Sequence, residues 1–275
     1  MMIREKNLTI VMNGRYEKDT KFNLLKVRKI FSKSQIILST YREALIDKQI
    51  FSDNSIELII NKDYGDYKGF SGNPKNLFRM MISFYKGLKN SKNNIVLRLR
   101  TDYSINKCLK NQLKKINIIE KKISFEKKSI NLQTIYSTNA AHLDYDNFHF
   151  SDQVILSSKK QLKDMYYVNK KKFLNRKDFS IYPKIHGKWG SMLASEQIIW
   201  INFLKRKFQI KDAFKIYKSR KLHNQISKNI IIMKNDNFII PRRLNNLRIW
   251  IRFYAMNNYN ILAKILRYFY FIKNN

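Results

Sequence analysis

The stretch Leu97-Arg98-Leu99-Arg100-Thr101-Asp102 has the pattern of a buried strand that ends in a charged turn. Side chains alternate between the two faces of a strand, so both arginines are expected on one face and both leucines on the other. A buried arginine normally binds a carboxylate or a phosphate. Asp102 places a carboxylate at the end of this strand, beside the two arginines, and is a candidate functional residue. The alternative is that one of the arginines is only a structural partner of Asp102.

Short apolar segments alternate with segments of helical periodicity along the N-terminal part of the chain. The expected strands cover residues 8–12, 35–39, 57–61 and 95–99, and the expected helices cover 21–31 and 75–90. Strands that are continuously apolar are typical of a mainly parallel sheet covered by helices on both faces. The sequence therefore predicts an α/β fold with a mostly parallel central sheet flanked by helices.

Polar residues and glycines follow several of the expected strands. Asn13-Gly14 ends the first strand, Asp63 follows the third, and Asp102 ends the fourth. Ligands of open α/β sheets bind at the carboxyl ends of the strands. These residues are therefore expected along one ligand-binding edge. The glycines of the segment 63–72 free its backbone, which indicates a loop at the same edge.

The pattern continues less regularly in the rest of the chain. We expect a lysine-rich helix and loop over 106–128, a strand over 133–137, a strand over 153–156 and a helix from about residue 159. Ser195-Glu196-Gln197 opens a further apolar helix.

The segment 241–275 differs in composition from the rest. It contains arginines and lysines but no Asp or Glu, and its cations alternate with Trp, Tyr, Phe and Leu. Such a mixture suits an amphipathic helix that lies on an anionic membrane surface. The alternative is a C-terminal helix that packs on the domain and turns a basic side to solvent. We therefore expect one domain over 1–240 and a basic helical tail over 241–275.

The composition bounds the class of protein. A chain of 275 residues with 44% hydrophobic residues can form a sizeable core, and its single cysteine cannot form an intrachain disulfide. The sequence shows neither a secretion signal nor an apolar stretch of about 20 residues that would span a membrane. The net charge of +35 draws the protein towards anionic partners. Together with the basic tail, these features predict a cytoplasmic protein, peripheral at the inner face of a bacterial plasma membrane.

Several short motifs follow one another in the sequence: Val11-Met12-Asn13-Gly14, Ile30-Phe31 before 35–40, 61–65, Asn76 and Arg79 before Gly87-Leu88-Lys89, 97–102, Phe150-Ser151-Asp152 and Ser195-Glu196-Gln197. In this order they resemble the WavE-type family of lipopolysaccharide-synthesis glycosyltransferases. The resemblance implies a GT-A-like fold, a nucleotide-sugar donor and a hexosyltransferase-like activity (EC 2.4). It also implies a glycan or glycolipid acceptor of lipopolysaccharide, lipooligosaccharide or capsule synthesis.

The same resemblance assigns roles to residues at the matching positions. Asn13 and Gly14 would border the nucleotide, and Asp63 would lie near its base or ribose. Asn76 and Arg79 would face the donor.

Asp102 takes the position of the metal-binding acidic motif of GT-A enzymes. A single carboxylate can contribute to a Mg²⁺ or Mn²⁺ site. Many GT-A enzymes carry two acidic residues where this chain has Arg100-Thr101-Asp102. One carboxylate holds a divalent ion weakly, so Arg98, Arg100 or Arg79 can share the phosphate charge instead.

Two carboxylates are candidates for the catalytic base that deprotonates an acceptor hydroxyl. Glu196 lies in the region where inverting GT-A enzymes place theirs, and Asp152 precedes a strand expected to border the acceptor. The alternative for Glu196 is a helix-terminal acid that complements the helix dipole, with Ser195 as its cap. The alternative for Asp152 is a cap of a turn.

Two other classes of function compete with an active transferase. One is an inactive scaffold with the transferase fold, and the other is a basic nucleic-acid-binding protein suggested by the charge. The charge is spread along the chain, and the sequence has no zinc-finger, homeodomain or RNP-type signature. We therefore expect no specific nucleic-acid partner.

Overall fold

The computed structural model describes residues 3–41, 46–63, 76–138, 147–148, 150, 154–167, 195–233 and 238–239. The chain divides into two compact units, Met1–Phe238 and Ile239–Asn275. The segment 241–275 lies outside the described residues, so its helical character and the division at residue 240 stay predictions.

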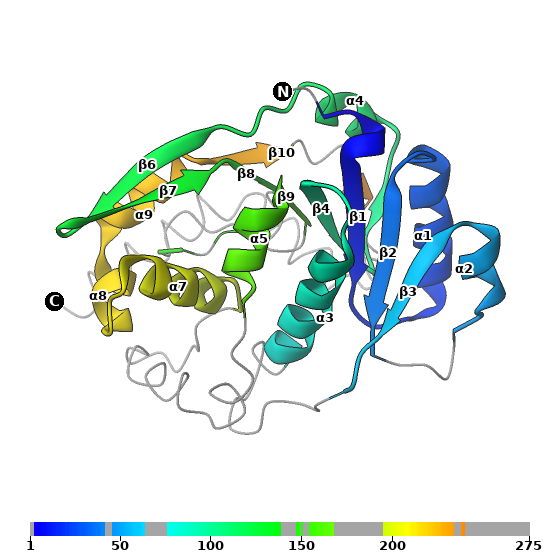
Figure 1. The fold of residues 1–275 in the computed structure, drawn as a ribbon, viewed down its shortest axis with the longest axis horizontal. Coiled ribbons are helices and arrows are strands. Elements are labelled where there is room, and N and C mark those ends of the chain that lie inside the picture. Colours follow the sequence, from blue (N-terminus) through cyan, green and yellow to red (C-terminus); the bar gives the residue numbers. More distant parts are fainter. Residues whose placement is uncertain are drawn as a thin grey trace, which may run out of the picture. The chain divides into compact units, whose positions relative to one another are not determined.

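A seven-stranded sheet forms the centre of the first unit, with the strand order β10-β8-β9-β4-β1-β2-β3 (Figure 1). Its strands are β1 (Leu8–Asn13), β2 (Gln35–Thr40), β3 (Ile56–Ile60), β4 (Ile95–Arg100), β8 (Ile135–Thr138), β9 (Val154–Ser158) and β10 (Ile230–Met233). β1 pairs in parallel with both β2 and β4, and β2 pairs in parallel with β3. The predicted α/β fold with a mostly parallel sheet is therefore confirmed.

One strand runs against the others. β9 is antiparallel to both of its neighbours, β4 and β8, whereas β10 is parallel to β8. A buried strand has the same apolar pattern in either direction, so the sequence predicted this strand without its orientation.

Helices cover both faces of the sheet. They are α1 (Lys18–Ile30), α2 (Gln49–Asp53), α3 (Leu77–Asn90), α4 (Cys108–Leu113), α5 (Lys159–Met165), α7 (Ser195–Phe208), α8 (Ala213–Lys218) and α9 (Arg220–Ser227). Alternate side chains of each strand enter two separate cores. Val11 packs with α3, α5 and α7 on one face, and Ile10 and Met12 pack with α1, α2 and α4 on the other.

α3 lies close against β1 because of a glycine in the helix. A Cβ atom added to Gly87 would lie 2.4 Å from Val11 Cγ1, so a larger residue would push the helix away from the strand. α3 packs on both β1 and β2, which fixes its first turn beside the carboxyl ends of these strands (Figure 1).

The expectation for residues 106–128 is only partly correct. α4 is a short helix, and it is followed by an antiparallel hairpin of β6 (Glu120–Phe125) and β7 (Lys128–Gln133). Ile123, Ile130 and Leu132 point into the core while the lysines between them are exposed. This alternation is that of a half-buried strand, and the many lysines of its outer face hide it in the sequence. The remaining short elements are the 3₁₀ turn η1 (Glu5–Asn7), β5 (Ser104–Ile105) and β11 (Phe238–Ile239).

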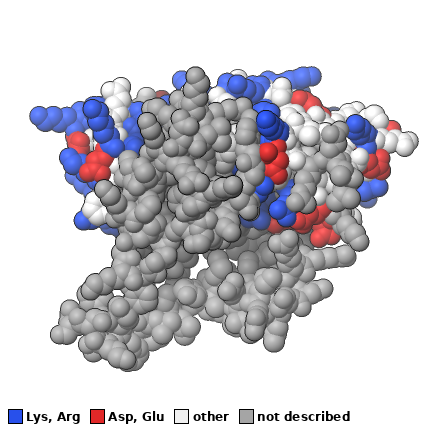
Figure 2. Space-filling model, turned by 90° about the horizontal axis from the view of Figure 1, so that it is seen from below, with Lys and Arg blue, Asp and Glu red and all other residues white. Residues whose placement is uncertain are grey.

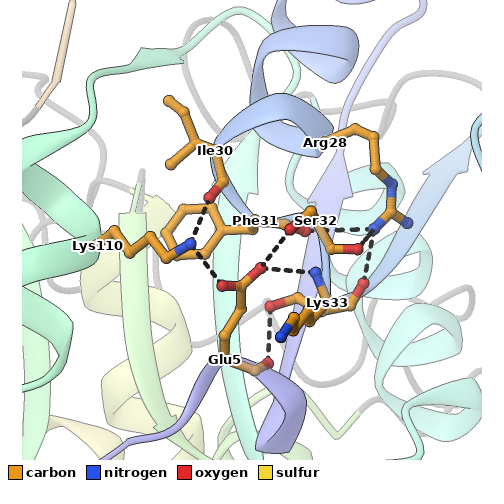
Figure 3. Close-up of polar contacts among 8 residues, drawn as sticks. Glu5, Arg28, Ile30, Phe31, Ser32, Lys33 and Lys110 are labelled. Carbon is orange, nitrogen blue, oxygen red and sulfur yellow. Dashed lines mark hydrogen bonds and ion pairs between the residues drawn. The ribbon is translucent and has the colours of Figure 1, made fainter.

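A polar cluster holds the opposite, amino-terminal edge of the sheet together (Figure 3). Glu5 accepts hydrogen bonds from Lys110 Nζ and from the Lys33 backbone N–H, each at 2.6 Å. The Arg28 side chain donates to the backbone carbonyls of Phe31, Ser32, Ser34 and Ser55. The cluster thereby satisfies carbonyl groups at the C-terminal end of α1, which a helix leaves unpaired.

Across the described ranges, no helix is both long and apolar enough to cross a membrane.

Candidate functional site

The carboxyl ends of β1, β2, β3 and β4, here called the carboxyl edge, lie beside one another and carry most of the candidate residues. Asn13 is the last residue of β1 and is buried. Its Nδ2 donates to the Met80 carbonyl and to Ser83 Oγ, each at 3.3 Å, so it ties the strand to α3. Its Oδ1 accepts a 2.8 Å hydrogen bond from Arg98 Nε. Asn13 is therefore held in one orientation by two neighbouring elements.

Arg98 is a fully buried arginine under the carboxyl edge. Besides the bond to Asn13, its Nη1 donates to the Tyr166 hydroxyl at 3.2 Å, and its guanidinium lies over the rings of Phe84 and Tyr166. Aromatic faces stabilise a desolvated cation. Arg98 thus supports the edge from below, and its burial separates it from the surface where a ligand would bind.

Gly14 follows Asn13 in a backbone conformation that other residues rarely adopt, with φ of +147°. A Cβ atom at this position would lie 2.4 Å from Thr101 Oγ1. The Thr101 backbone N–H donates to the Asn13 carbonyl, and Asn23 Nδ2 of α1 donates to the Thr101 carbonyl at 3.0 Å. The ends of β1 and β4 are therefore in close contact, which only a glycine permits.

A two-pronged ion pair joins the segment after β3 to α3. Arg79 Nε and Nη2 donate to the two carboxylate oxygens of Asp63, at 2.6 and 3.1 Å. Arg79 Nη1 also donates to Asn76 Oδ1 at 3.0 Å. The arginine side chain is 11% exposed and that of Asp63 is 34% exposed. The structure thus brings together three residues that the resemblance assigned to the donor.

A second two-pronged ion pair lies at the end of β4. Arg100 Nε and Nη2 donate to the two carboxylate oxygens of Asp102, at 2.9 and 2.6 Å. The guanidinium also lies over the ring of Tyr103. The side chains of Arg100 and Asp102 are 43% and 26% exposed. The pairing of an arginine with Asp102 agrees with the alternative that one arginine is its structural partner, and that arginine is Arg100.

Tyr41, directly after β2, lies in the electrostatic field of Asp63 and of three arginines, Arg15, Arg79 and Arg100. Burial raises the pKa of its phenol above the ordinary value and Asp63 adds to this, while Arg79, Arg15 and Arg100 act to lower it. The Arg79 guanidinium lies 5.8 Å from the ring centre. The phenol therefore stays protonated at neutral pH, and it can donate a hydrogen bond.

Arg15 is the residue of this edge that sequence reasoning missed. It follows Gly14, is exposed, and acts electrostatically on Tyr41. The signal in the sequence was its place directly after the glycine turn at a strand end.

The end of β2 adds a layer of buried polar groups to the edge. Asn61 Nδ2 donates to Ser39 Oγ at 2.9 Å and to the Thr40 carbonyl at 2.8 Å, and Ser39 Oγ donates to the Ser83 carbonyl at 2.7 Å. Asn61, Ser39 and Thr40 are all buried. This layer links β2, the end of β3 and α3, so the floor of the edge is polar.

The family is decided by a match over most of the chain: residues 12–261 match the family described as WavE lipopolysaccharide synthesis. The chain belongs to the WavE family. The match confirms the resemblance to the WavE-type family of lipopolysaccharide synthesis. Comparison with curated protein sequences gives no significant match.

Several solved structures are similar to this WavE family member. The glycosyltransferase GlyE of Streptococcus pneumoniae TIGR4 in its apo form has 14% identity and a TM-score of 0.41, and the alignment covers 93% of this chain and 63% of that chain. A second GlyE structure has 12% identity and a TM-score of 0.41, and that alignment covers 83% of this chain and 45% of that chain. An active-site mutant of LgtC has 10% identity and a TM-score of 0.42, with 86% of each chain covered. The chain thus spans less than two thirds of the GlyE chains, and the family match alone identifies it.

The two candidate bases differ in what the structure describes. Glu196 lies in the first turn of α7 and is half-buried. The adjacent Gln197 donates to the Asn147 carbonyl at 2.9 Å, which fixes the start of the helix. Asp152 lies outside the described residues. The base therefore stays a prediction for both.

The described residues of the carboxyl edge do not form a site for a divalent metal ion. Within the described ranges, no three His, Cys, Asp or Glu residues lie close enough together to hold one. Asp102 offers a single carboxylate, and both of its oxygens accept hydrogen bonds from Arg100. A Mg²⁺ or Mn²⁺ ion prefers several free oxygen ligands. The role of Asp102 as a metal ligand stays a prediction.

Lys and Arg side chains lie at several places on one face of the molecule. Figure 2 shows the molecule from below the view of Figure 1, with Lys and Arg side chains scattered over several elements and smaller acidic groups between them.

Proposed function

We propose that this chain transfers a sugar from a nucleotide-sugar donor to a glycan acceptor in the synthesis of lipopolysaccharide, lipooligosaccharide or capsule. The observation that carries the proposal is the presence of two Arg–Asp ion pairs at the carboxyl edge, Arg79–Asp63 and Arg100–Asp102, whose arginines both act on the Tyr41 phenol. The carboxyl ends of strands are where ligands of α/β sheets bind. Membership of the WavE family supports the same reaction class.

The chemistry of these side chains suits the departure of a nucleoside diphosphate. When the bond from the sugar to the diphosphate breaks, negative charge accumulates on the phosphate oxygens. Guanidinium groups stabilise that charge through paired hydrogen bonds. Asp63 and Asp102 hold their arginines in fixed orientations, so little reorganisation is needed when the charge develops.

The acceptor hydroxyl needs a base if the transfer inverts the anomeric configuration. We propose Glu196 for this role, with Asp152 as its rival. Glu196 is half-buried at the start of a helix that packs against the sheet. Glu196→Gln keeps the shape of the side chain and removes the base. Loss of transfer with unchanged donor binding would support the assignment, and full activity would transfer it to Asp152.

The donor is identified by a thermal-shift screen of UDP-, GDP-, CMP- and ADP-linked sugars, each with and without Mn²⁺. A ligand that binds only the native state raises the apparent stability according to its affinity. No shift with any of these donors would refute the proposal.

Turnover of the selected donor then tests the site. We expect Asp102→Ala to lower the rate of donor hydrolysis and transfer, because Arg100 loses the carboxylate that orients it. Asp164→Ala is the matched control: it also removes an aspartate from an ion pair, with Lys207, between α5 and α7. Equal turnover of the wild type and Asp102→Ala would remove Asp102 from the mechanism, whereas no turnover of any donor by the wild type would favour an inactive scaffold.

The finer details of the activity belong to the same proposal. We propose a hexose-like donor sugar, and contact of the tail 241–275 with an anionic membrane surface. Membrane contact is measured by cosedimentation of the full chain with vesicles of phosphatidylglycerol, compared with vesicles of phosphatidylcholine. Strong sequence-dependent binding to duplex DNA, beyond that to heparin at the same salt concentration, would instead favour the nucleic-acid-binding alternative.

A further inference from the structure

The cations of the carboxyl edge differ in how much of their charge is available to a ligand. Arg79 and Arg100 are each paired with an aspartate through two hydrogen bonds. Arg98 is fully buried and supports Asn13 from below. A diphosphate carries more than one negative charge, so two arginines already neutralised by aspartates would leave part of that charge uncompensated.

Arg15 has the opposite character. Its side chain is exposed and makes no ion pair or hydrogen bond with any residue in the described part of the chain. It lies at the end of β1, between the ends of β2 and β4 in the sheet order. Its position two residues after the carboxyl end of β1 places it on the same edge as the two ion pairs, and its charge, like those of Arg79 and Arg100, acts on the Tyr41 phenol.

The backbone of Arg15 is fixed although its side chain is not. Its carbonyl accepts a hydrogen bond from Thr20 Oγ1 at 3.3 Å, and Thr20 belongs to the capping box that starts α1. On its other side, Gly14 is held against Thr101. Because the main chain of Arg15 is fixed and its guanidinium is exposed, the guanidinium can reach a ligand at the carboxyl edge without a movement of the main chain.

We propose that Arg15 binds the diphosphate of the donor and supplies the unpaired positive charge that Arg79 and Arg100 do not. A guanidinium can donate two parallel hydrogen bonds to phosphate oxygens, which makes arginine better suited than lysine to this role. The proposal rests on the proposed function, because it takes the carboxyl edge as the donor site. It also implies that binding of the diphosphate does not require a divalent metal ion.

The test compares the binding of nucleoside diphosphates with that of the matching nucleosides. Calorimetric titrations of the full chain are made in buffer with EDTA. The ligands are the diphosphates UDP, GDP, CDP and ADP, the nucleosides uridine, guanosine, cytidine and adenosine, and inorganic pyrophosphate. The variants are Arg15→Gln and Arg15→Lys. Arg4→Gln is the matched control, since Arg4 is also exposed and lies before η1 at the other end of β1.

We expect Arg15→Gln to weaken the binding of the preferred diphosphate and of pyrophosphate by about tenfold or more, as for a lost hydrogen bond to a charged group. The affinity for the nucleoside should stay the same. The affinity of Arg15→Lys for the diphosphate should lie between those of Arg15→Gln and the wild type, because an ammonium group keeps the charge but cannot donate two parallel hydrogen bonds. Arg4→Gln has no effect beyond that of lowering the net charge by one. The thermal midpoints of all variants match that of the wild type, because neither arginine side chain has a partner to lose among the described residues.

Each of the following results would overturn the inference. Equal weakening by Arg15→Gln and Arg4→Gln would attribute phosphate binding to the general field of the protein. Equal weakening of nucleoside and diphosphate by Arg15→Gln would mean that Arg15 only supports the turn. Binding that disappears in EDTA and returns with Mn²⁺ would assign the charge compensation to a metal ion.

The same experiment separates this inference from the proposed function. If the wild type binds pyrophosphate through Arg15 but binds none of the nucleotides, the anion site stands and the nucleotide-sugar donor is wrong. If nucleotides bind equally to the wild type and Arg15→Gln, the donor stands and the role of Arg15 is wrong.

Discussion

Arg98 and Asn13 are joined in the interior by a hydrogen bond of 2.8 Å from Nε to Oδ1. The bond runs between neighbouring strands, from the middle of β4 to the last residue of β1. Asn13 in turn donates to the Met80 carbonyl and to Ser83 of α3. A buried charge therefore fixes the strand end that precedes Gly14 and Arg15.

Replacing this buried arginine should destabilise the protein. Arg98→Met leaves Asn13 Oδ1 without this donor, and we expect a loss of about 1–3 kcal/mol in the free energy of unfolding. Urea denaturation followed by circular dichroism measures it. Arg100→Met, two residues along the same strand, is the control. Its side chain is 43% exposed, so its ion pair should contribute less than about 1 kcal/mol. Equal losses for both variants would contradict the role of Arg98.

The contact between Gly14 and Thr101 predicts a coupled pair of substitutions. Gly14→Ala places a Cβ atom 2.4 Å from Thr101 Oγ1 and forces φ of +147° on an alanine. We expect a loss of about 1–3 kcal/mol from the backbone strain and a further loss from the contact. In the Thr101→Ala background the loss that comes from the contact should disappear, while the loss from backbone strain should remain. A loss of the same size in both backgrounds, measured by urea denaturation, would mean that the contact does not limit the size of residue 14.

The ion pair of Asp63 and Arg79 should contribute more to stability than a pair on the open surface. We expect Asp63→Asn to lower the free energy of unfolding by about 1 kcal/mol, after allowance for solvent screening at a carboxylate that is 34% exposed. Asp47→Asn breaks a pair with Lys21 in which both side chains are 51% exposed, so its effect should be close to zero. Both are measured at low salt and in about 1 M NaCl, where the difference should shrink. A larger effect of Asp47→Asn would be inconsistent with this ranking.

The cluster around Glu5 predicts how stability depends on pH. Burial acts to raise the pKa of the Glu5 carboxyl, but the hydrogen bonds from Lys110 and from the Lys33 backbone outweigh it, so the pKa is lowered. A carboxyl with a lower pKa in the folded state contributes stability above its unfolded pKa of about 4.3, and this contribution is lost as the pH falls through the folded value. Glu5→Gln should therefore be less stable than the wild type at about pH 7, and the difference should narrow below about pH 4. A constant difference in urea midpoint between neutral and acidic pH would contradict the lowered pKa.

The elements that follow apolar periodicity could be predicted from the sequence. The first four strands of the central sheet and α3 lie within a few residues of their predicted bounds. α8, α9 and β10 were missed. α8 and α9 are short, and each starts at a capping side chain, Asp212 or Ser219, that accepts a hydrogen bond from the backbone of the first turn. Helices of this length have too few turns to show a clear period.

The candidate site was predicted as a set of positions and not as a set of contacts. Asn13, Asp63 and Asp102 were expected at one edge because parallel strands end on the same side of a sheet. That Asp63 binds Arg79 and Asp102 binds Arg100 depends on the directions of the side chains. Arg15 was missed, because its role depends on the arginines near it being already paired.

The sequence by itself determined the α/β class, the edge that carries the polar residues and the family, because the alternation of apolar segments records which parts of the backbone are buried. Only the tertiary structure decided the reversed direction of β9, the close contact of Gly14 with Thr101, and which arginine faces which carboxylate. The physical reason is the separation along the chain of the residues that interact. Burial is a local property that each segment carries with it, whereas an ion pair between residues 63 and 79, or a contact between 14 and 101, exists only after the strands have paired in register and α3 has packed on them.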